Sequence, residues 1–468
     1  MTTRKAVFIE TIGCQMNAYD TERIAEGLRT LGYAVASSPE KADLIIANTC
    51  SVREKAEQKA FSFLGRLNRL KKNNPRLIIG VGGCVAQQEG RRILRRVPHV
   101  DLVFGTAAVG RVPAAVAKIE KNRCRIVDVA MHEDAAAPPR RCDPPMEGGV
   151  SRFVTIMRGC ENYCTYCIVP LVRGPEKSRP PAAVIQEVKD LVRCGAAEVT
   201  LLGQNVNSYG RKEGLPAFSA LLEQVNAVEG LLRIRFTTSH PKDLTDELAA
   251  CFGRLEKLCR HIHLPVQSGS DDVLRRMNRR YTRARYLARI ALLRRICPDI
   301  AVTSDVIVGF PGETEAAFAD TMDLVRQVRF DNLFAFKYSD RPGTRAAGYA
   351  NKVPADVKSE RLERLLNLQA EMTREKNEQK TGAVLPVLVE GKNRKPPRAA
   401  STAVPSAAEW TGRTTCNRIV HFAGPEETRP AGVVDVRIEK ALAHSLRGRV
   451  VENAVHHHPA KGKKCHAA

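Results

Sequence analysis

The stretch RGCENYCTYC, residues 158–167, follows an apolar strand pattern and places Cys160, Cys164 and Cys167 within eight residues. Three thiolates at this spacing can each ligate a different iron of one cubane iron–sulfur cluster. No fourth cysteine is close by in the sequence, so one iron would stay open for a ligand. Zinc sites favour paired C-x-x-C elements instead. With Tyr166 before the last cysteine, the motif cysteine set (Cys160, Cys164, Cys167) indicates a radical enzyme whose open iron binds S-adenosylmethionine.

The sequence around this motif predicts the domain that carries it. Apolar strand patterns alternate with helical patterns over residues 151–350. The strand candidates are RFVTIM (152–157), EVTLLG (198–203), RIRFTT (233–238), HIHLPV (261–266), AVTSDVIVG (301–309) and NLFAFKYS (332–339). Six such units predict an α/β fold of the incomplete (β/α)6-barrel type, to which we assign residues 146–376.

Towards the amino terminus, a second alternation predicts another α/β domain over residues 5–121. Its strand candidates are KAVFIETIG (5–13), DLIIANT (43–49), RLIIGVGG (76–83) and DLVFG (101–105), with helical patterns between them. Apolar strands that alternate with helices indicate a doubly wound parallel sheet. Residues 122–145, which end in the Pro-rich stretch AAAPPRRCDPP and are followed by Gly148 and Gly149, predict a linker between this domain and the barrel.

The first three of these amino-terminal strands each end next to a cysteine: Cys14, Cys50 and Cys84. Parallel strands end on the same edge of a sheet, so we expect this auxiliary cysteine set to converge there and hold a second cluster. The flanking Gly13, Gly82 and Gly83 would let the backbone approach a bulky cofactor. The alternative is that the three are core cysteines. We interpret the eight others as structural or incidental: Cys124, Cys142, Cys194, Cys251, Cys259, Cys297, Cys416 and Cys465.

After the barrel, residues 354–381 predict one long charged helix, and the pattern then changes to short strands. These strands, VLPVLVEG, NRIVHF and VVDVRIEKA, predict a small antiparallel barrel over residues 379–443. The basic, Pro-rich Lys392–Trp410 segment predicts a mobile loop within it. Residues 444–468 predict a disordered tail, whose histidines we interpret as solvated.

The charge balance predicts a polyanionic partner. The chain has 74 Lys+Arg against 51 Asp+Glu, a formal net charge of +23, which favours nucleic acid, although general solubility is the alternative. No apolar run is long enough for a membrane span or a signal peptide, so we expect a cytoplasmic protein without a membrane partner. Thiols stay reduced in that compartment, so a disulfide framework does not account for the 14 cysteines.

With these motifs in place, the chain resembles the methylthiotransferase family over nearly its whole length. The matching pieces are IGCQMNAYD, NTCSVREKAEQK, GGCVAQ, RGCENYCTYCIVPLVRGPEKSRP, LLGQNVNSYG, TTSHP, HLPVQSGSDDVLRRMNRRYT, DVIVGFPGETE, YSDRPGT and GRTTCNR. TTSHP, HLPVQSGS and GRTTCNR look most like the MiaB branch. The resemblance implies two 4Fe–4S clusters, a radical S-adenosylmethionine core and a carboxyl-terminal TRAM domain. It also implies an electron donor such as flavodoxin or ferredoxin.

The MiaB branch is implied to convert N6-isopentenyladenosine at position 37 of the tRNA anticodon loop to its 2-methylthio form. One S-adenosylmethionine would methylate a sulfur at the auxiliary cysteine set. A second would be cleaved at the motif cysteine set to a 5′-deoxyadenosyl radical that removes hydrogen from C2. An aromatic C2–H is not acidic enough for an ordinary base, which is why a radical is required.

The resemblance also implies contact residues. Those expected to touch S-adenosylmethionine, besides Tyr166, are Gly203, Gln204, Asn205, Gln267, Ser268, Gly309 and Pro311, all at carboxyl ends of predicted strands. Those expected to touch RNA are Arg413, Asn417 and Arg418, for which a solvated basic face is the alternative. The basic helix Arg53–Lys72 is a further RNA candidate.

Two other functions stay open at this stage. One is a sister methylthiotransferase acting on threonylcarbamoyl-adenosine in tRNA or on a protein side chain. The other is a non-catalytic protein that binds RNA and structural zinc. The sequence decides neither the cluster geometry nor the oligomeric state.

Overall fold

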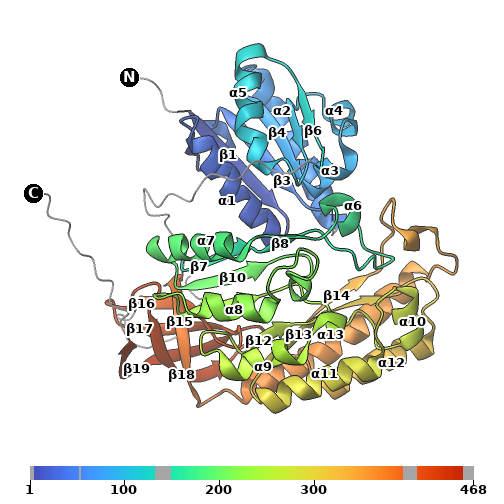
Figure 1. Ribbon diagram of the computed structural model, residues 1–468, viewed down its shortest axis with the longest axis vertical. Helices are drawn as coiled ribbons and strands as arrows, with labels where there is room; N and C mark the ends of the chain where they lie inside the picture. Colours follow the sequence, from blue (N-terminus) through green and yellow to red (C-terminus); the bar gives the residue numbers. More distant parts are fainter. Residues whose placement is uncertain (1–4, 52–53, 132–148, 394–407, 457–468) are drawn as a thin grey trace, which may run out of the picture.

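The computed structural model describes residues 5–51, 54–131, 149–393 and 408–456. It contains an amino-terminal sheet domain, a central half-open barrel and a small closed barrel at one end of the central one (Figure 1). This confirms the predicted fold class of a parallel doubly wound sheet, an incomplete (β/α)6 barrel and a small β-barrel. The small barrel is antiparallel as predicted except between β17 and β19, which pair in parallel. Among the described helices, none has both the length and the apolar composition needed to cross a bilayer.

The amino-terminal domain is a six-stranded parallel sheet in the order β2-β1-β3-β4-β5-β6. Its strands are β1 Ala6–Ile12, β2 Ala34–Val35, β3 Leu44–Thr49, β4 Ile78–Gly83, β5 Leu102–Phe104 and β6 Ile126–Asp128. Its helices are α1 Gln15–Arg29, α2 Glu54–Asn73, α3 Cys84–Glu89, α4 Arg92–Arg96 and α5 Val112–Asn122.

The central strand β3 explains why helices cover both faces of this sheet. All six of its residues are buried. Ile45 and Ala47 pack in the core beneath α2, whereas Leu44 and Ile46 pack in the core beneath α1 and α5. Successive strand residues point to opposite faces, so a strand that is apolar at nearly every position needs cover on both.

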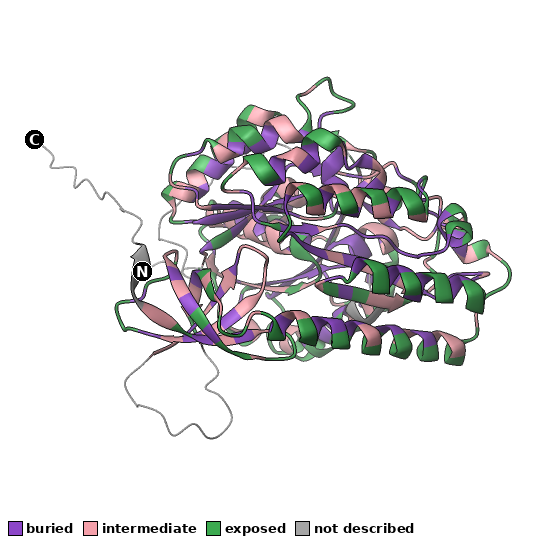
Figure 2. Cartoon of the chain, turned by 90° about the horizontal axis from the view of Figure 1, so that it is seen from below, coloured by how far each residue is buried: buried purple, intermediate pink, exposed green. Residues whose placement is uncertain are grey.

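The central domain has six parallel barrel strands in two three-stranded sheets, β11-β10-β7 and β12-β13-β14. An isolated parallel bridge between Ile234 and Leu258 joins the two halves. The strands are β7 Ser151–Thr155, β10 Glu198–Leu202, β11 Arg233–Phe236, β12 His261–His263, β13 Ala301–Val308 and β14 Asn332–Lys337. In Figure 2 these buried strands lie inside helices whose outer faces are exposed.

The helices around this barrel are α6 Val169–Arg173, α7 Pro181–Arg193, α8 Phe218–Asn226, α9 Asp246–Arg254, α10 Asp271–Arg276, α11 Arg283–Ile296, α12 Glu315–Val328 and α13 Ala355–Glu378. A two-stranded antiparallel ribbon, β8 Met157–Arg158 with β9 Lys177–Ser178, brackets the motif loop and α6. Helix α13 corresponds to the predicted long helix and leads into the small barrel.

The small barrel is closed in the order β15-β16-β17-β19-β18. Its strands are β15 Val384–Lys392, β16 Ala408–Thr414, β17 Ile419–Gly424, β18 Val433–Ala441 and β19 Leu446–His456. The core of the contact with the large barrel joins Val150 and Ala197, which immediately precede β7 and β10, to Leu388. The small barrel therefore packs against the amino ends of the large barrel's strands, opposite the carboxyl ends where its chemistry is expected.

Five of the described strands lie where the sequence predicted none: β2, β6, β9, β16 and β19. Of these, β16 begins inside the predicted Lys392–Trp410 loop. β6 falls inside the predicted linker 122–145, and it pairs with β5 at the sheet edge. β19 falls inside the predicted disordered tail 444–468, where it pairs with both β17 and β18 and so closes the small barrel. Barrel closure removes the exposed edges of β17 and β18, a long-range gain that the basic, weakly patterned sequence of β19 does not reveal. Most of the predicted Lys392–Trp410 loop and the end of the tail lie outside the described residues.

Candidate active site

The auxiliary cysteine set comes together at the carboxyl edge of the amino-terminal sheet. Cys14 caps the start of α1, Cys50 follows β3, and Cys84 is the first residue of α3. The three side chains are close enough for Cys14 and Cys84 both to raise the pKa of the Cys50 thiol. Cys50 and Cys84 are buried, whereas Cys14 is exposed.

Hydrogen bonding from Cys50 lowers the pKa of Cys14 to about 6 and that of Cys84 to about 7, against the opposing effect of burial. The positive charge of Arg173 lowers both pKa values further. The pKa of Cys50 is raised, because its proton is shared with both neighbours. Deprotonated thiols are the form that ligates iron, so two of the three side chains are already prepared as ligands.

A buried amide network fixes the strand ends that carry these cysteines. Asn17 Oδ1 accepts a hydrogen bond from the Cys14 backbone N–H at 3.1 Å, and Asn17 Nδ2 donates to Asn48 Oδ1 at 2.9 Å. Asn48 Nδ2 returns a hydrogen bond to the Asn17 carbonyl at 2.9 Å. Thr49 Oγ1 donates to the Gly82 carbonyl at 2.6 Å, which ties β3 to β4. Apart from the family motifs IGCQMNAYD and NTCSVREKAEQK, nothing in the sequence predicts this network.

The glycines beside the auxiliary set are packed closely against the protein itself. A Cβ on Gly82 would lie 2.2 Å from the Phe104 ring, and one on Gly83 would lie 2.2 Å from the Thr49 carbonyl oxygen. A Cβ on Gly13 would lie 2.2 Å from Asn17 Oδ1. Each glycine is therefore required by close packing of the protein on itself, and at Gly83 also by φ +90°.

The motif cysteine set lies in the loop between β8 and α6, on the central domain. Cys160 N–H donates to the Gly174 carbonyl at 3.3 Å, and Cys167 N–H donates to the Cys164 carbonyl at 2.9 Å. Burial raises the pKa of Cys160 to about 11 and that of Cys167 to about 12, with a further upward contribution from the nearby Cys164 in both cases. The three side chains therefore lie near enough to one another to influence one another's pKa. Bound iron would stabilise their thiolate forms.

Arg279, which the sequence patterns did not single out, secures this loop. Its side chain is buried, donates to the Pro265 carbonyl at 2.7 Å, and lies 3.5 Å from both the Cys164 sulfur and the Tyr166 hydroxyl. Tyr166 itself packs beside the apolar cluster around Phe310. The only sequence signal for Arg279 is its place in the RRMNRRYT motif, whose arginines are indistinguishable in the sequence from the general basic charge.

The two cysteine sets lie across the interface of their domains. Cys84 packs directly against Ile168 and Val172 of the central domain. Ile168 is the residue after Cys167, so one side chain links the two sets. Among the described residues, no three His, Cys, Asp or Glu side chains converge as ligands of a single metal ion.

The three predicted contact residues that follow β10, namely Gly203, Gln204 and Asn205, lie near the motif loop. Gln204 Oε1 accepts the Gly159 N–H at 2.6 Å and thereby supports the motif loop. Gly203 has no room for a side chain, because a Cβ would lie 2.5 Å from Met157. Asn205 Nδ2 donates to Asp243 at 2.8 Å, while its buried Oδ1 has no partner. Among Gly203, Gln204 and Asn205, Asn205 is therefore the residue with a side-chain polar atom available to a ligand.

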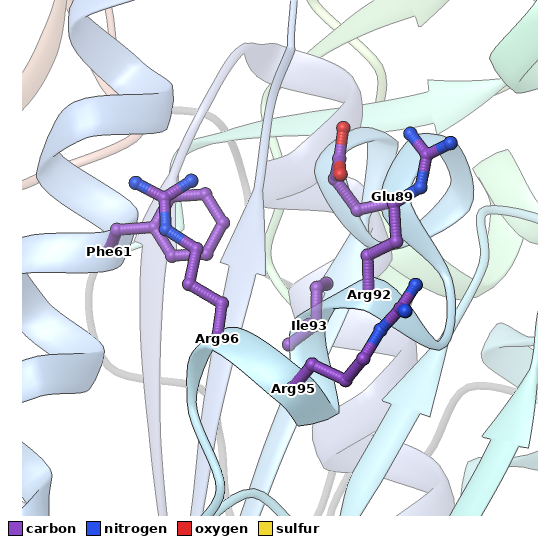
Figure 3. A pocket seen from close by; sticks show the side chains of 6 residues that line it. All are labelled: Phe61, Glu89, Arg92, Ile93, Arg95 and Arg96. Carbon is purple, nitrogen blue, oxygen red and sulfur yellow. The ribbon is translucent and has the colours of Figure 1, made fainter.

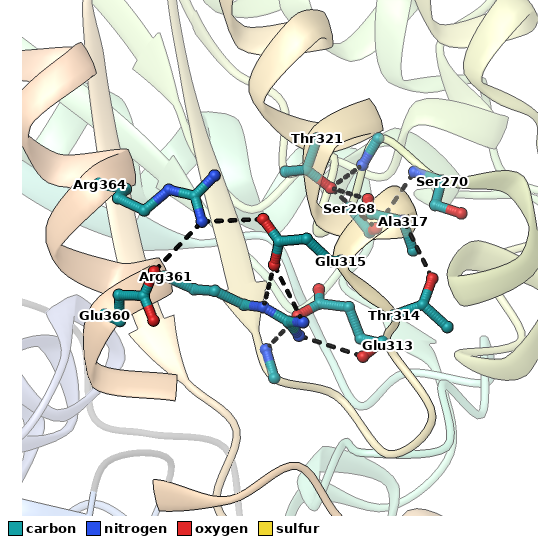
Figure 4. A network of polar contacts seen from close by, with 12 residues as sticks. Ser268, Ser270, Glu313, Thr314, Glu315, Ala317, Thr321, Glu360, Arg361 and Arg364 are labelled. Carbon is teal, nitrogen blue, oxygen red and sulfur yellow. Dashed lines mark hydrogen bonds and ion pairs between the residues drawn. The ribbon is translucent and has the colours of Figure 1, made fainter. Parts of the chain in front are cut away.

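After β12 the two predicted contacts, Gln267 and Ser268, differ in availability; Figure 4 shows Ser268 beside Thr321. Ser268 is fully buried, and its hydroxyl lies 3.3 Å from that of Thr321 and accepts the Ser270 N–H at 3.2 Å. The Ser268 hydroxyl thus joins the loop after β12 to α12, a role that the sequence did not predict. Gln267 adopts φ +74°, a costly conformation for a residue with a side chain, and its buried Oε1 has no partner.

The GFPGET turn after β13 is held in place by α13 (Figure 4). Gly309 N–H donates to Glu313 Oε2 at 2.6 Å, and Arg361 pairs with the same carboxylate at 3.0 Å. Gly309 has φ +70°, and a Cβ there would meet Lys358 at 2.3 Å. Pro311 follows as a buried turn residue. The turn is thus a fixed backbone segment, as a cradle for a flat ring would need to be.

Buried polar atoms without partners gather near the motif set. They belong to Asn162, Asn205, Asn207, Ser239, His240 and Gln267. Buried polar groups are normally satisfied, so such a concentration at strand carboxyl ends indicates that a polar ligand completes the site. The amino, carboxylate and hydroxyl groups of S-adenosylmethionine fit this demand.

The predicted RNA residues of the small barrel have separate positions. Arg413 pairs with Glu390 at 2.8 Å and donates to Asn417 Oδ1 at 3.2 Å, and both remain partly exposed. Arg418 instead pairs with Asp331 at 2.9 Å and has an 11 % exposed side chain. Arg418 thus fastens the small barrel to β14, which leaves Arg413 and Asn417 as the accessible candidates.

A second basic surface lies on the amino-terminal domain. A hollow of about 370 Å³ between α2 and α4 is lined by Arg92, Arg95 and Arg96, with the Arg96 guanidinium 3.6 Å from the Phe61 ring centroid (Figure 3). A second hollow along α2 is lined by Gly65, Arg66, Asn68, Arg69 and Lys72. This basic surface, defined by Arg66, Arg69, Lys72, Arg92, Arg95 and Arg96, includes the end of the predicted basic helix; Arg53 lies outside the described residues.

The remaining described cysteines show no third site. Cys251, Cys259 and Cys297 are buried free thiols, and Cys124 and Cys416 are half-buried ones. Cys194 is disulfide-bonded, which the sequence did not predict. Cys142 and Cys465 lie outside the described residues.

Comparison with known proteins matches three family models along the chain. Residues 6–105 match Uncharacterized protein family UPF0004, residues 154–325 the Radical SAM superfamily, and residues 378–451 the TRAM domain. The tRNA-2-methylthio-N(6)-dimethylallyladenosine synthase of Desulfosudis oleivorans is 50% identical over 99% of this chain and 100% of its own length. The one of Syntrophotalea carbinolica is 51% identical over 96% of this chain and 100% of its own length.

The chain belongs to the MiaB-type tRNA methylthiotransferase family.

Among solved structures, the radical S-adenosylmethionine methyltransferase TsrM from Kitasatospora setae is similar in fold, with a TM-score of 0.54 at 14% sequence identity. The match covers 82% of this chain and 81% of that chain. The central domain makes up much less than 82% of this chain, so the similarity in fold extends beyond the large barrel. Membership of the MiaB-type family makes the chain a radical S-adenosylmethionine enzyme with 4Fe–4S clusters.

Proposed function

We propose that the chain inserts a methylthio group at C2 of N6-isopentenyladenosine 37 in the tRNA anticodon stem-loop, using two separate 4Fe–4S clusters. Cys14, Cys50 and Cys84 would hold one cluster, and Cys160, Cys164 and Cys167 the other. The single observation that carries this is the packing of Cys84 against Ile168, because it brings a three-thiol set of one domain beside the three-thiol set of another.

When bound, the clusters and two molecules of S-adenosylmethionine would supply reductive cleavage of a sulfonium bond at one set and a methylated sulfur at the other. The protein's own part is to hold the two thiol sets and to exclude water. Asn205 and Gln267 offer buried acceptors for the methionine amino group, and the fixed turn from Gly309 to Pro311 offers backbone for the adenine. Electrons would come from a small carrier such as flavodoxin or ferredoxin.

Nucleoside analysis tests the substrate. The chain is expressed in a bacterial strain that lacks its own synthase, and digested tRNA is examined by mass spectrometry. We expect 2-methylthio-N6-isopentenyladenosine to appear and N6-isopentenyladenosine to fall. A change in threonylcarbamoyl-adenosine instead would assign the chain to the sister activity. A zinc-containing, colourless protein after anaerobic purification would support the non-catalytic alternative.

The basic surface of the amino-terminal domain is our candidate for a phosphate contact with the anticodon stem. Its arginines are exposed, and Arg92, Arg95 and Arg96 lie on α4, within a few residues of α3 and Cys84. Arginine pairs well with phosphate oxygens, and the net charge of +23 provides long-range attraction. Arg413 and Asn417 on the small barrel would contact a second, distant part of the same tRNA.

We expect the triple variant Arg92→Gln/Arg95→Gln/Arg96→Gln to bind tRNA more weakly. Each phosphate contact that is lost lowers the slope of log affinity against log salt by roughly 0.7–0.9. Binding measured at several salt concentrations checks this. The control is Arg254→Gln/Arg260→Gln/Arg275→Gln, which removes three exposed arginines with side chains 58%, 58% and 75% accessible elsewhere on the barrel. Equal slopes for the two triple variants would exclude the surface as a specific contact.

A further inference from the structure

Helix α6 ends in a buried arginine that reaches from the central domain to the amino-terminal one. Arg173 lies six residues after Cys167 in the sequence and has a 7% exposed side chain. Its Nη2 donates to Asp20 Oδ2 at 3.0 Å, and Asp20 lies on α1, the helix that Cys14 caps. An ion pair this enclosed spans the domain interface directly beside the auxiliary set.

The same helix places Arg173 next to Cys84. Ile168, which precedes α6, and Val172 within it pack on Cys84, and Thr106 Oγ1 donates to the Val172 carbonyl at 2.6 Å. The positive charge of Arg173 lowers the pKa of both Cys84 and Cys14. Arg173 thus belongs to the helix that packs near Cys84, and it pairs with an acidic residue on the helix that Cys14 caps.

A cation in this position has a definite electrostatic effect. Each electron added to an iron–sulfur cluster makes the cluster and its thiolates one unit more negative. Hydrogen bonds and nearby charge set cluster reduction potentials, and an enclosed charge is poorly screened. The positive charge favours the reduced form, and the negative charge of the Asp20 carboxylate opposes it.

We propose that Arg173 is a positioning residue that raises the reduction potential of the cluster held by Cys14, Cys50 and Cys84, and that Asp20 moderates this effect. The inference rests on the proposed two-cluster function. It assigns a specific task to the LVRG segment: the helix that follows one cluster motif tunes the other cluster.

The test is a redox titration followed by electron paramagnetic resonance. It uses the full-length chain in which Cys160, Cys164 and Cys167 are replaced by alanine, so that only the auxiliary cluster is loaded. In this background Arg173→Gln is expected to lower the midpoint potential, and Arg173→Lys to keep it near the value of the parent. Asp20→Asn is expected to shift the midpoint potential upward. A residue that only holds the domains together would not give shifts of opposite sign.

Arg152→Gln is the matched control. Arg152, on β7, pairs with Glu22 at 3.6 Å, so its replacement removes a second ion pair to α1 at the same domain interface. We expect the midpoint potential to stay at the parent value in this variant. If Arg173→Gln fails to retain the cluster because Asp20 is left buried and unpaired, the double variant Arg173→Gln/Asp20→Asn replaces it. Its potential should lie below the parent, since Arg173 directly follows Val172, which packs in the cluster around Cys84.

Two results overturn the inference: an unchanged midpoint potential in Arg173→Gln or in the double variant, or a failure of Asp20→Asn to move it upward. Both leave the proposed function intact. The proposed function itself fails on a separate result, namely that the parent chain without the motif cysteines takes up no iron–sulfur cluster at all.

Discussion

Replacement of Cys50 by alanine is expected to abolish methylthio insertion while leaving cleavage of S-adenosylmethionine to 5′-deoxyadenosine in place. Cys50 is the thiol of the auxiliary set whose pKa both Cys14 and Cys84 raise. Its loss removes one of three proposed cluster ligands on the amino-terminal domain and none on the central domain. Iron content should fall from about eight to about four atoms per chain after anaerobic reconstitution. Product analysis and an iron assay check the two parts.

The control for this variant is Cys297→Ala. Cys297 is a buried free thiol in the core of the large barrel, away from both cysteine sets. Removing one buried sulfur there should cost about 1 kcal/mol of stability and leave iron content and both products unchanged. Continued sulfur insertion by Cys50→Ala at the normal rate would refute the assignment of the auxiliary set.

Gly159→Ala is expected to reduce S-adenosylmethionine cleavage by on the order of 100-fold, through displacement of the motif loop. Gly159 has φ +77°, and a Cβ there would lie 1.8 Å from the Pro175 carbonyl oxygen, which is backbone and cannot rotate away. The adjacent Cys160 N–H and the Gln204 side chain both depend on this backbone position. Iron content of the motif cluster and the rate of 5′-deoxyadenosine formation measure the effect.

Gly195→Ala is the control that separates the effect of backbone strain from the effect of a steric clash of the new Cβ. Gly195, just after α7, has φ +92°, yet no atom lies within 4 Å of the place that a Cβ would take. We expect this variant to lose about 1–2 kcal/mol of stability from left-handed strain alone and to keep full cleavage activity. A Gly159→Ala protein that loads its cluster and cleaves at the normal rate would show that the loop can move aside.

The sheet domain and the large barrel were predictable because their signals are local. Strands such as β3 and β4 are buried at every position and largely apolar, and turn residues separate them from helices, so chain order alone reveals the alternation. β6 and β19 escaped prediction because each is stabilised mainly by its neighbours in space. Their own sequences carry too little apolar periodicity to stand out.

The residues of the candidate site likewise fall into those that the sequence predicts and those that only the structure identifies. Six cysteines stand out because thiolate spacing and strand-end position are written in the sequence. Arg173 and Arg279 do not stand out among 74 Lys+Arg, because burial and contact with sulfur distinguish them, and both are properties of the folded chain. Arg418 is the opposite case, because its motif predicted an RNA contact. In the structure its ion pair with Asp331 joins the small barrel to the large barrel.

By itself, the sequence determined which residues are the candidate cluster ligands and which folds carry them, since ligand chemistry and hydrophobic periodicity depend on residue type and spacing. Only the tertiary structure decided that Cys84 packs on Ile168, that the small barrel covers the amino ends of the large barrel's strands, and that Arg173 lies between the two sets. Those outcomes depend on how separately folded surfaces pack, and packing is set by shape and charge over distances in space that no local pattern records.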